Sequence, residues 1–332
     1  MTDRAAHPRI AVTLGDPAGV GPELAARLLA DPANREAAEI TVLASRAELD
    51  AAAAVAGVEV PIAGTPGPGH VVLLDDGTEA GPIPPKQISE EAGRRAMHQL
   101  LRALAMARAG EIDGIVFTPL NKTSLSMAGM HEEDELRWFA RELGHEGVTS
   151  EINIIDGLWT ARVTSHVSIA DVGERVTAPN VTAAIGLLHT LLRDSGLDAP
   201  RLGVCALNPH NGENGLFGRH EIDHIRPAVE AARAGGIDVA GPFPSDTIFL
   251  ARERYDGIVT MYHDQGQIAI KLLGFDGGVT VQGGLPVVIA TPAHGTAFDI
   301  AGQGIARIAS TQNAFDVAVS IARRAVRRAA AA

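Results

Sequence analysis

Three histidines each follow a short apolar segment, at the point where that segment gives way to a polar loop: His166 after Leu158–Val163, His210 after Arg201–Leu207, and His263 after Ile258–Met261. Such segments are short enough to be buried strands, and strand ends in a doubly wound sheet converge on one crevice. Three neutral imidazoles beside open positions suit a catalytic divalent metal, zinc foremost, with magnesium, manganese or cobalt as alternatives. A single histidine in such a place is more often an ordinary polar residue, so the prediction requires all three to meet.

A metal held in this way would polarise a hydroxyl or carbonyl group of a substrate. Oxidation of a β-hydroxy acid gives a β-keto acid, which can lose carbon dioxide and then needs an acid to protonate the enolate. Lys271 lies eight residues after His263, inside the otherwise apolar segment Ile268–Leu273. A buried lysine with a lowered pKa is one candidate for that acid. The alternative is a lysine whose stem packs on apolar surface while its ammonium group reaches solvent.

A glycine-rich turn, Gly15–Glu23, follows the strand predicted for Arg9–Leu14 and runs into a helix predicted from Pro22. Strand, glycine-rich turn and helix N-terminus can together cradle a phosphate group. The dinucleotide-binding fingerprint is not completed, because Leu24 occupies the position of the third glycine. We therefore expect a tight turn that brings Asp16 and the helix N-terminus towards a ligand.

Apolar runs and helical patterns follow one another along the chain, which indicates an α/β protein. Ser89 is expected to cap a helix that runs to residue 108, and residues 127–143 carry a helical pattern. An Asp-Gly pair at 156–157 predicts a hairpin turn. Lys122 lies in a polar segment that follows another predicted strand. This segment could be a helix-capping turn, or Lys122 could contact a ligand, and both alternatives are open. Ser245 or Asp246 is expected to cap a short helix.

The composition excludes several classes of protein. The 332 residues are 46% hydrophobic, enough for a sizeable core and for two lobes rather than one. A formal net charge of −12 argues against nucleic acid as a partner. The single cysteine, Cys205, excludes disulfides within the chain and is expected to be a buried, inert thiol. No apolar run reaches the length of a membrane span and no apolar signal core is present, so we expect a soluble, cytoplasmic protein.

Six motifs, taken together, resemble the 4-hydroxythreonine-4-phosphate dehydrogenase (PdxA) family. They are Gly15–Glu23, Thr164–His166, Leu207–His210, Gly241–Asp246, Tyr262–Gly266 and His294–Ala297. The resemblance covers the chain from end to end, and the order and spacing of the motifs are specific.

The resemblance implies a two-lobed α/β/α architecture, similar to isocitrate and isopropylmalate dehydrogenases, with a cleft between the lobes. Residues 1–125 with 275–332 would form the cofactor-side domain, and residues 126–274 would carry the metal ligands and the dimer interface. The protein would be a homodimer whose active sites draw on both subunits. The reaction would oxidise a secondary hydroxyl β to a carboxylate, usually with decarboxylation.

The resemblance also implies roles for individual residues. The metal ligands would be His166, His210 and His263, and the catalytic residues would be Lys271, Asp246 and Asp264. NAD or NADP would lie along His294, Gly295, Thr296, Ala297 and Asp299 rather than in a glycine fingerprint. Substrate contacts would fall at Asp16, Lys122, Glu135, Arg137, Thr280 and Ile289.

The sequence departs from the biosynthetic enzymes where those enzymes hold the substrate phosphate. Their Gly-His-Thr-Glu motif aligns with Asp134–Arg137, and two carboxylates would repel a phosphate dianion. A substrate-holding arginine aligns with Ile289, which cannot make the two-point contact of a guanidinium group. The chain therefore resembles a divergent member with altered substrate choice. The segments Ile270–Leu273 and Leu216–Gly218 resemble the terephthalate dihydrodiol dehydrogenase branch.

The sequence leaves several functions open. The first is a dehydrogenase of a hydroxy acid, either phosphate-free, as Asp134 and Glu135 favour, or 4-hydroxythreonine 4-phosphate itself, which Arg137 could still accommodate. The second is a metal hydrolase that uses the same three histidines. The third is a binding protein that has lost turnover. The predicted cofactor loop favours a dehydrogenase over a hydrolase, and retention of the predicted metal ligands argues against a binding protein.

Overall fold

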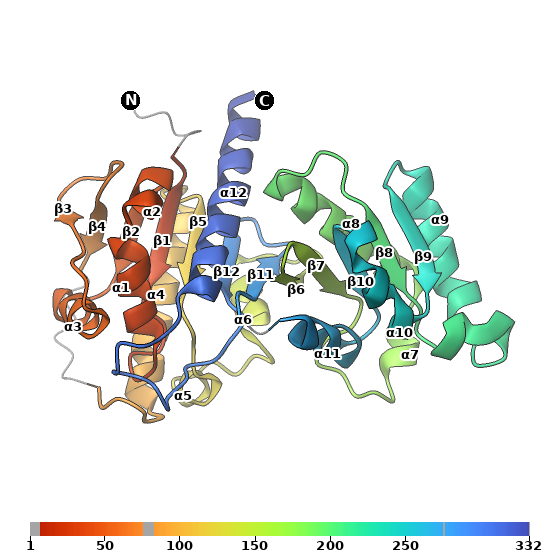
Figure 1. The fold of residues 1–332 in the computed structure, drawn as a ribbon, viewed down its shortest axis with the longest axis horizontal. Coiled ribbons are helices and arrows are strands. Elements are labelled where there is room, and N and C mark those ends of the chain that lie inside the picture. Colours follow the sequence, from red (N-terminus) through yellow and green to blue (C-terminus); the bar gives the residue numbers. More distant parts are fainter. Residues whose placement is uncertain (1–6, 76–82, 275, 332) are drawn as a thin grey trace. The chain divides into compact units, whose positions relative to one another are not determined.

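The computed structural model describes residues 7–75, 83–274 and 276–331, and the chain divides into two compact units. Unit 1 comprises Met1–Glu146 and Leu285–Ala332, and unit 2 comprises Gly147–Gly284. Each unit contains strands flanked by helices, so the predicted α/β class is confirmed (Figure 1). The unit boundaries differ from those expected after residues 125 and 274. The segment after residue 125 packs on unit 1 helices, and the last strand before residue 284 pairs within unit 2.

The sheet of unit 1 is parallel, with the strand order β3-β4-β2-β1-β5-β12. Its strands are β1 (Arg9–Thr13), β2 (Glu39–Leu43), β3 (Ile62–Ala63), β4 (Val71–Leu74), β5 (Gly114–Phe117) and β12 (Val288–Pro292). β1 and β5 are central and almost completely buried. Burial on both faces explains why these two segments read as continuous apolar runs rather than as an alternating pattern.

Helices cover both faces of the unit 1 sheet (Figure 1). They are α1 (Gly21–Ala30), α2 (Pro32–Ala37), α3 (Arg46–Ala56), α4 (Glu90–Arg108), α5 (Lys122–Met127), α6 (Glu135–Leu143) and α12 (Ala309–Ala331). The chain leaves β1 towards β2 on one side and reaches β5 on the other, so right-handed crossovers place α1 and α4 on opposite faces. α1 contacts α3 and α12, whereas α4 contacts α5 and α6.

Two helix predictions in unit 1 have different outcomes. Ser89 caps α4 as expected, since its side chain accepts a hydrogen bond from the backbone N–H of Ala92 at 3.1 Å. The single helix expected over 127–143 is wrong, because α5 ends at Met127 and α6 begins only at Glu135. Gly129 adopts a positive φ of 105° between them, and Asp134 caps the new helix.

The sheet of unit 2 is mixed, with the order β11-β6-β7-β10-β8-β9. Its strands are β6 (Ser150–Ile155), β7 (Leu158–Arg162), β8 (Leu202–Cys205), β9 (Val239–Phe243), β10 (Gly257–Thr260) and β11 (Val279–Gly283). β6 and β7 form the predicted hairpin, with Asp156 and Gly157 both at positive φ in the turn. β10 lies between β7 and β8 and runs parallel to both.

The helical segments of unit 2 connect these strands. They are α7 (Val172–Arg175), α8 (Ala178–Ser195), η1 (Pro209–Gly215), η2 (Glu221–Ile225), α9 (Arg226–Ala234), α10 (Ser245–Ile248), η3 (Phe249–Arg254) and α11 (His263–Leu273). The capping prediction for α10 is wrong: Ser245 and Asp246 lie inside the helix, and Pro244 occupies the cap position. Cys205 is buried in β8 and burial raises the pKa of its thiol, as expected of an inert residue. No helix among the described residues has the length and hydrophobicity needed to span a membrane.

Candidate functional site

The three predicted metal-binding histidines leave unit 2 from the carboxyl ends of three adjacent parallel strands. β7, β10 and β8 are neighbours in the sheet, and they are followed by His166, His263 and His210 respectively. Parallel strands in adjacent positions deliver their following loops to the same sheet edge. The structure therefore places the three histidine-bearing loops at one edge, as the sequence predicted.

Hydrogen bonds hold these strand ends to one another. The backbone N–H and the hydroxyl of Thr164 both donate to the carbonyl of Met261, at 3.1 and 2.9 Å, and join the ends of β7 and β10. Gln265 joins β10 to β8, because its Oε1 accepts from the N–H of Met261 at 2.7 Å and its Nε2 donates to the carbonyl of Ala206 at 2.9 Å. Gln265 was not among the predicted site residues, although it stands in the Tyr-His-Asp-Gln motif.

The rings of His166 and His263 lie close together, with centroids 5.7 Å apart. Two imidazoles that bind one ion with nitrogens about 2.1 Å from it have ring centres roughly 5 Å apart, so this pair fits a shared cation. His263 Nδ1 also lies 2.7 Å from Asp264 Oδ1. Donation from Nδ1 to that carboxylate would leave Nε2 as the ligand atom, the usual arrangement for a metal-binding histidine.

His210 has different surroundings from the other two histidines. Its ring is exposed and lies 6.2 Å, centroid to centroid, from the ring of Phe217. Within the described part of a single chain, no three histidine, cysteine or acidic side chains are grouped closely enough to hold a metal ion. The single chain thus brings two of the three predicted ligands together and presents the third on a neighbouring loop.

One face of α11 carries further polar groups of unit 2. His263, Gln267 and Lys271 are spaced by four residues and therefore lie along the same side of the helix. Gln267 Nε2 donates to Asn153 Oδ1 at 2.8 Å, and Asn153 Nδ2 donates to the hydroxyl of Thr280 at 3.0 Å. Asn153 and Gln267 were missed by sequence reasoning, although Asn153 interrupts an apolar strand and Gln267 shares the helical spacing.

The interpretation of Lys271 as a buried lysine is wrong for the single chain. Lys271 is exposed in the last turn of α11, beside Leu272, whose side chain is 82% exposed. The apolar residues around it do not enclose it: Ile270 is buried and Leu273 packs against the same core cluster, whereas Lys271 and Leu272 are exposed. Asp246 on α10 and Asp264 on α11 are also exposed, and their catalytic roles remain predictions.

In unit 1, Asp16 lies in the turn after β1 and is 1% exposed. Its Oδ1 accepts from the N–H of Ala18 at 2.8 Å, whereas Oδ2 has no hydrogen-bond partner among the described residues. Burial raises the pKa of Asp16, partly offset by the hydrogen bond from Ala18. A buried carboxylate with one unpartnered oxygen suits a ligand that donates a hydrogen bond there.

The raised pKa of Asp16 predicts a pH-dependent penalty on folding. Because the folded pKa lies above the unfolded value, stability falls as the pH rises from about 4 through the folded pKa. Asp16→Asn should therefore raise the free energy of unfolding by about 1 kcal/mol at pH 8 and leave it unchanged near pH 3. Asp31→Asn is the matched control, since exposed Asp31 accepts the equivalent hydrogen bond from Ala33 at 2.9 Å. Denaturant titrations at both pH values test this, and an equal effect of Asp16→Asn at both would contradict it.

The predicted phosphate-side residues cluster at the N-terminus of α6. Asp134 is buried and caps the helix by accepting from the N–H of Arg137 at 2.8 Å. Glu135 forms an ion pair with Lys122, Oε2 to Nζ, at 3.7 Å. Arg137 lies in the same turn and is exposed. The acidic pair thus has local partners, and Lys122 is available to a ligand only in competition with Glu135.

Ile289 is not a substrate contact. It lies in β12, is 0% exposed, and belongs to the hydrophobic core of unit 1 with Phe117, Trp138 and Phe139. A side chain without accessible surface cannot touch a ligand, so Ile289 serves core packing in this chain.

The predicted cofactor loop, His294–Asp299, packs on the glycine-rich turn after β1. The N–H of Val20 donates to the carbonyl of Thr296 at 3.0 Å. A Cβ atom added at Gly19 would lie 2.8 Å from Thr296, so only glycine allows this approach. Lys86 Nζ donates to the carbonyl of Asp299 at 2.9 Å and ties a third segment to the loop. The loop is therefore held by two segments that lie far from it in the sequence.

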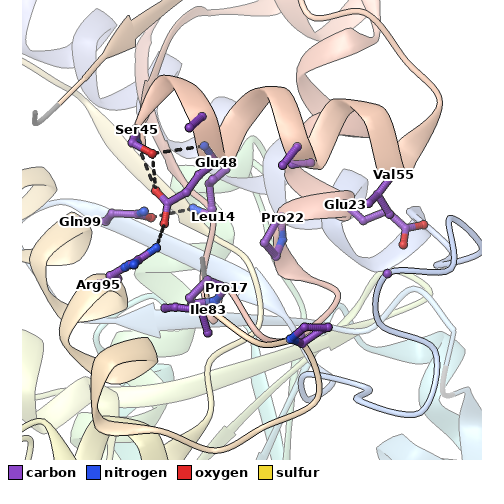
Figure 2. A pocket seen from close by; sticks show the side chains of 16 residues that line it. Leu14, Pro17, Pro22, Glu23, Ser45, Glu48, Val55, Ile83, Arg95 and Gln99 are labelled. Atoms are coloured by element: carbon purple, nitrogen blue, oxygen red, sulfur yellow. Dashed lines mark hydrogen bonds and ion pairs between the residues drawn. The ribbon is translucent and has the colours of Figure 1, made fainter. Parts of the chain in front are cut away.

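A pocket of about 600 Å³ lies in unit 1 beside these segments (Figure 2). Figure 2 shows Ser45, Glu48, Arg95 and Gln99 together on one side, where Arg95 Nη1 lies 3.0 Å from Glu48 Oε1. The remaining wall is largely apolar and comes from α1, α3 and the turns around positions 17, 83 and 302. Its size suits a small-molecule site. The sequence could not predict it, because five separate segments form its walls.

Comparisons with known proteins agree with the motifs. A family model described as "Pyridoxal phosphate biosynthetic protein PdxA" matches residues 33–318. A Pseudomonas aeruginosa protein named "Putative 4-hydroxythreonine-4-phosphate dehydrogenase 2" is 52% identical over 331 residues, which cover 95% of this chain and 97% of that protein. Other relatives carry the name D-threonate 4-phosphate dehydrogenase.

Solved structures give the same result. A 4-hydroxythreonine-4-phosphate dehydrogenase from Klebsiella pneumoniae is 35% identical with a TM-score of 0.81, over 96% of this chain and 98% of that one. A terephthalate 1,2-cis-dihydrodiol dehydrogenase from Burkholderia xenovorans is 29% identical with a TM-score of 0.68, over 92% and 95% of the two chains. A β-decarboxylating dehydrogenase from Thermococcus kodakarensis shares the fold, with a TM-score of 0.53 at 14% identity. The motifs, the family model and the full-length similarity agree: this chain belongs to the PdxA family of dehydrogenases.

Proposed function

We propose that this member of the PdxA family is a metal-dependent, NAD(P)-linked dehydrogenase that oxidises the hydroxyl of a β-hydroxy acid, with loss of the carboxylate as carbon dioxide. The observation that carries the proposal is the placement of His166, His263 and His210 after three adjacent parallel strands, with the first two rings 5.7 Å apart. Family membership supports the oxidoreductase class.

Each group of residues has a defined part in this proposal. The three histidines would hold a divalent ion, which when bound polarises the substrate hydroxyl and carbonyl. His294–Asp299 would hold the cofactor on the surface of the turn after β1, and Asp16 would accept a hydrogen bond from the ligand. Lys271 would supply the proton that the enolate takes up after decarboxylation. Thr280 would contact the substrate from the Asn153–Gln267 network.

Geometry along α11 supports an active site shared between two copies of the chain. Lys271 lies eight residues after His263, which is about 12 Å along the helix axis. A proton donor must come within hydrogen-bond distance of the atom it protonates, so the two residues of one chain would not easily serve the same substrate atom. In a homodimer, Lys271 of one copy can serve the histidines of the other. Exposure of Lys271 and Leu272 in the single chain agrees with burial in such a dimer.

We propose a substrate without a phosphate group, on the basis of the residues at the N-terminus of α6. Glu135 already pairs with Lys122, and neither Asp134 nor buried Ile289 can hold an anion. The similarity to a terephthalate dihydrodiol dehydrogenase favours a cyclic dihydrodiol carboxylate. The second candidate is a phosphorylated hydroxy acid such as 4-hydroxythreonine 4-phosphate or D-threonate 4-phosphate, because relatives carry those names.

Glu135→Gln is expected to shift substrate choice towards phosphorylated acids. Removal of the carboxylate frees Lys122 and relieves repulsion of a phosphate, which should raise kcat/KM for a phosphorylated substrate about tenfold. kcat/KM for a dihydrodiol carboxylate should change less than about threefold, because an exposed ion pair contributes little. Glu142→Gln on the same helix is the matched control, since that residue pairs with exposed Arg141. Equal changes for both substrates would contradict a role for Glu135 in selecting charge.

A substrate screen tests the proposed function directly. Cofactor reduction would be followed with 4-hydroxythreonine 4-phosphate, phosphorylated four-carbon sugar acids and cyclic diol carboxylates, with NAD or NADP, and with or without a chelator. The proposal predicts reduction that a chelator stops and that added zinc, cobalt, manganese or magnesium restores. Reduction that is indifferent to the chelator would remove the metal from the proposal. Hydrolysis of an ester or amide analogue without cofactor would favour the hydrolase instead.

A further inference from the structure

The loop that carries His210 has an unusual backbone. His210, Asn211, Glu213 and Asn214 adopt φ values of 52°, 57°, 41° and 55°, and Gly212 between them has a φ of 74°. Left-handed conformations are unfavourable for residues with a side chain and normally occur singly. Such a run persists only where the surrounding structure determines it, and it occurs preferentially at functional sites. Something outside the loop must therefore hold it.

Glu221 is the residue that contacts this loop on both sides of His210. Its Oε1 accepts hydrogen bonds from the backbone N–H groups of Leu207 at 2.9 Å and Asn208 at 2.7 Å. Its Oε2 accepts from Asn208 Nδ2 at 3.0 Å. A Cβ atom added at Gly212 would lie 2.6 Å from the same Oε2, so the carboxylate also packs against the middle of the left-handed run.

Burial and position make Glu221 an effective anchor. The side chain is 1% exposed, and a buried carboxylate is retained only where hydrogen bonds compensate for its lost hydration. Glu221 opens η2, a π-helical turn that continues into α9, and both oxygens face the segment before His210. Anionic groups are favoured at helix N-termini, and π turns often mark functional sites.

We propose that Glu221 is the positioning residue for His210. It holds the loop in its left-handed conformation, so that the imidazole is already placed for metal binding. This inference rests on the proposed function, since it assigns His210 to the metal. Glu221 acts through the backbone of Leu207 and Asn208 rather than by touching the ion. Removal of such a supporting group typically lowers metal affinity about 10- to 100-fold.

Four variants test the proposal through the affinity for Co²⁺, measured by titration and by the absorption spectrum of the bound ion. Glu221→Ala removes the acceptor of two part-buried backbone amides and should weaken Co²⁺ binding about 10- to 100-fold. The Co²⁺ affinity of Glu221→Gln should stay within about threefold of wild type. The glutamine oxygen can accept hydrogen bonds from both backbone amides, and the Asn208 side-chain amide can rotate so that its oxygen accepts from the glutamine nitrogen. Asn208→Asp places a second carboxylate against Glu221 and should weaken binding, whereas Asn208→Asp combined with Glu221→Gln should restore it.

Asp223→Asn is the matched control. Asp223 lies on the same turn and pairs with Arg219 at 2.8 Å on the surface, so its loss should leave Co²⁺ affinity unchanged. Restored Co²⁺ binding in the double variant would show that repulsion between two carboxylates causes the defect of Asn208→Asp. A general loss of folding would not be repaired by adding Glu221→Gln. Wild-type affinity and an unchanged Co²⁺ spectrum in folded Glu221→Ala would overturn the proposal.

Hydrogen exchange on the metal-free protein separates this inference from the proposed function. Peptides that cover residues 206–217 should exchange faster in Glu221→Ala and Asn208→Asp, and at the wild-type rate in Glu221→Gln and Asp223→Asn. If wild type binds no metal, the proposed function fails; faster exchange in Glu221→Ala would then still support Glu221 as the anchor of the His210 loop. Unchanged exchange in Glu221→Ala would overturn that role whatever the metal result.

Discussion

His210→Ala is expected to abolish metal-dependent reduction of NAD(P) while leaving the protein folded. His210 is exposed and does not contribute to a core cluster, so its removal leaves packing intact. Loss of one of three protein ligands should lower kcat/KM roughly a thousandfold or more, because the ion would be held poorly and would polarise the substrate less. The rate would be measured after chelation and addition of each divalent metal, with circular dichroism and gel filtration to check folding and assembly.

His189→Ala provides the control for this experiment. His189 lies on α8, partly buried and remote in sequence from the three strand ends, so its removal should leave metal-dependent turnover close to wild type. His166→Ala and His263→Ala should behave like His210→Ala. Full activity in His210→Ala would show that two histidines suffice or that the metal assignment is wrong, and the Co²⁺ affinity of the variant would decide between these.

Lys271→Met should lower the rate of oxidative decarboxylation by about 10²- to 10⁴-fold, the range for loss of a general acid. The side chain is exposed in the single chain, so little change in stability is expected. Lys271→Arg keeps the charge but donates a proton poorly at neutral pH, and it should therefore be nearly as impaired. Release of carbon dioxide and reduction of the cofactor would be measured separately. Unchanged turnover in Lys271→Met would contradict a catalytic role for Lys271.

Mixing His210→Ala with Lys271→Met tests whether the two residues serve one site from different copies. Random exchange of subunits would make half of the dimers hybrids, each with one site that retains both residues, so about a quarter of wild-type activity should return. If both residues of a site come from the same chain, every site in a hybrid lacks one of them and no activity returns. The mixture thus gives opposite results for a shared and an unshared site.

Several features of the site could be predicted from residue types and local spacing. Apolar runs ending in Thr-Ser-His, Asn-Pro-His and Tyr-His-Asp identified three strands and the histidines after them, because burial on both faces demands continuous hydrophobicity. The Asp156–Gly157 turn and the Ser89 cap followed from the same local chemistry. Family membership followed from motifs whose order spans the chain.

Contacts between distant segments were beyond such reasoning. A buried Lys271 was one of two alternatives because its neighbours are apolar, yet α11 turns Ile268, Lys271 and Leu272 outward. A single sequence does not show which face of a helix the sheet covers. Ile289 aligned with a ligand contact but lies in the core of unit 1. Asn153, Gln265, Gln267 and Glu221 were missed, since each acts through a partner that is at least 13 residues away or on another strand end.

The sequence by itself determined the α/β class, the family, and the three histidines at strand ends, because hydrophobic periodicity and short motifs are local properties of the chain. Only the tertiary structure decided that β10 lies between β7 and β8, and that the rings of His166 and His263 meet. It also decided that a buried carboxylate from η2 holds the His210 loop. Strand order and contacts between distant segments depend on non-local packing energies, which local patterns do not encode.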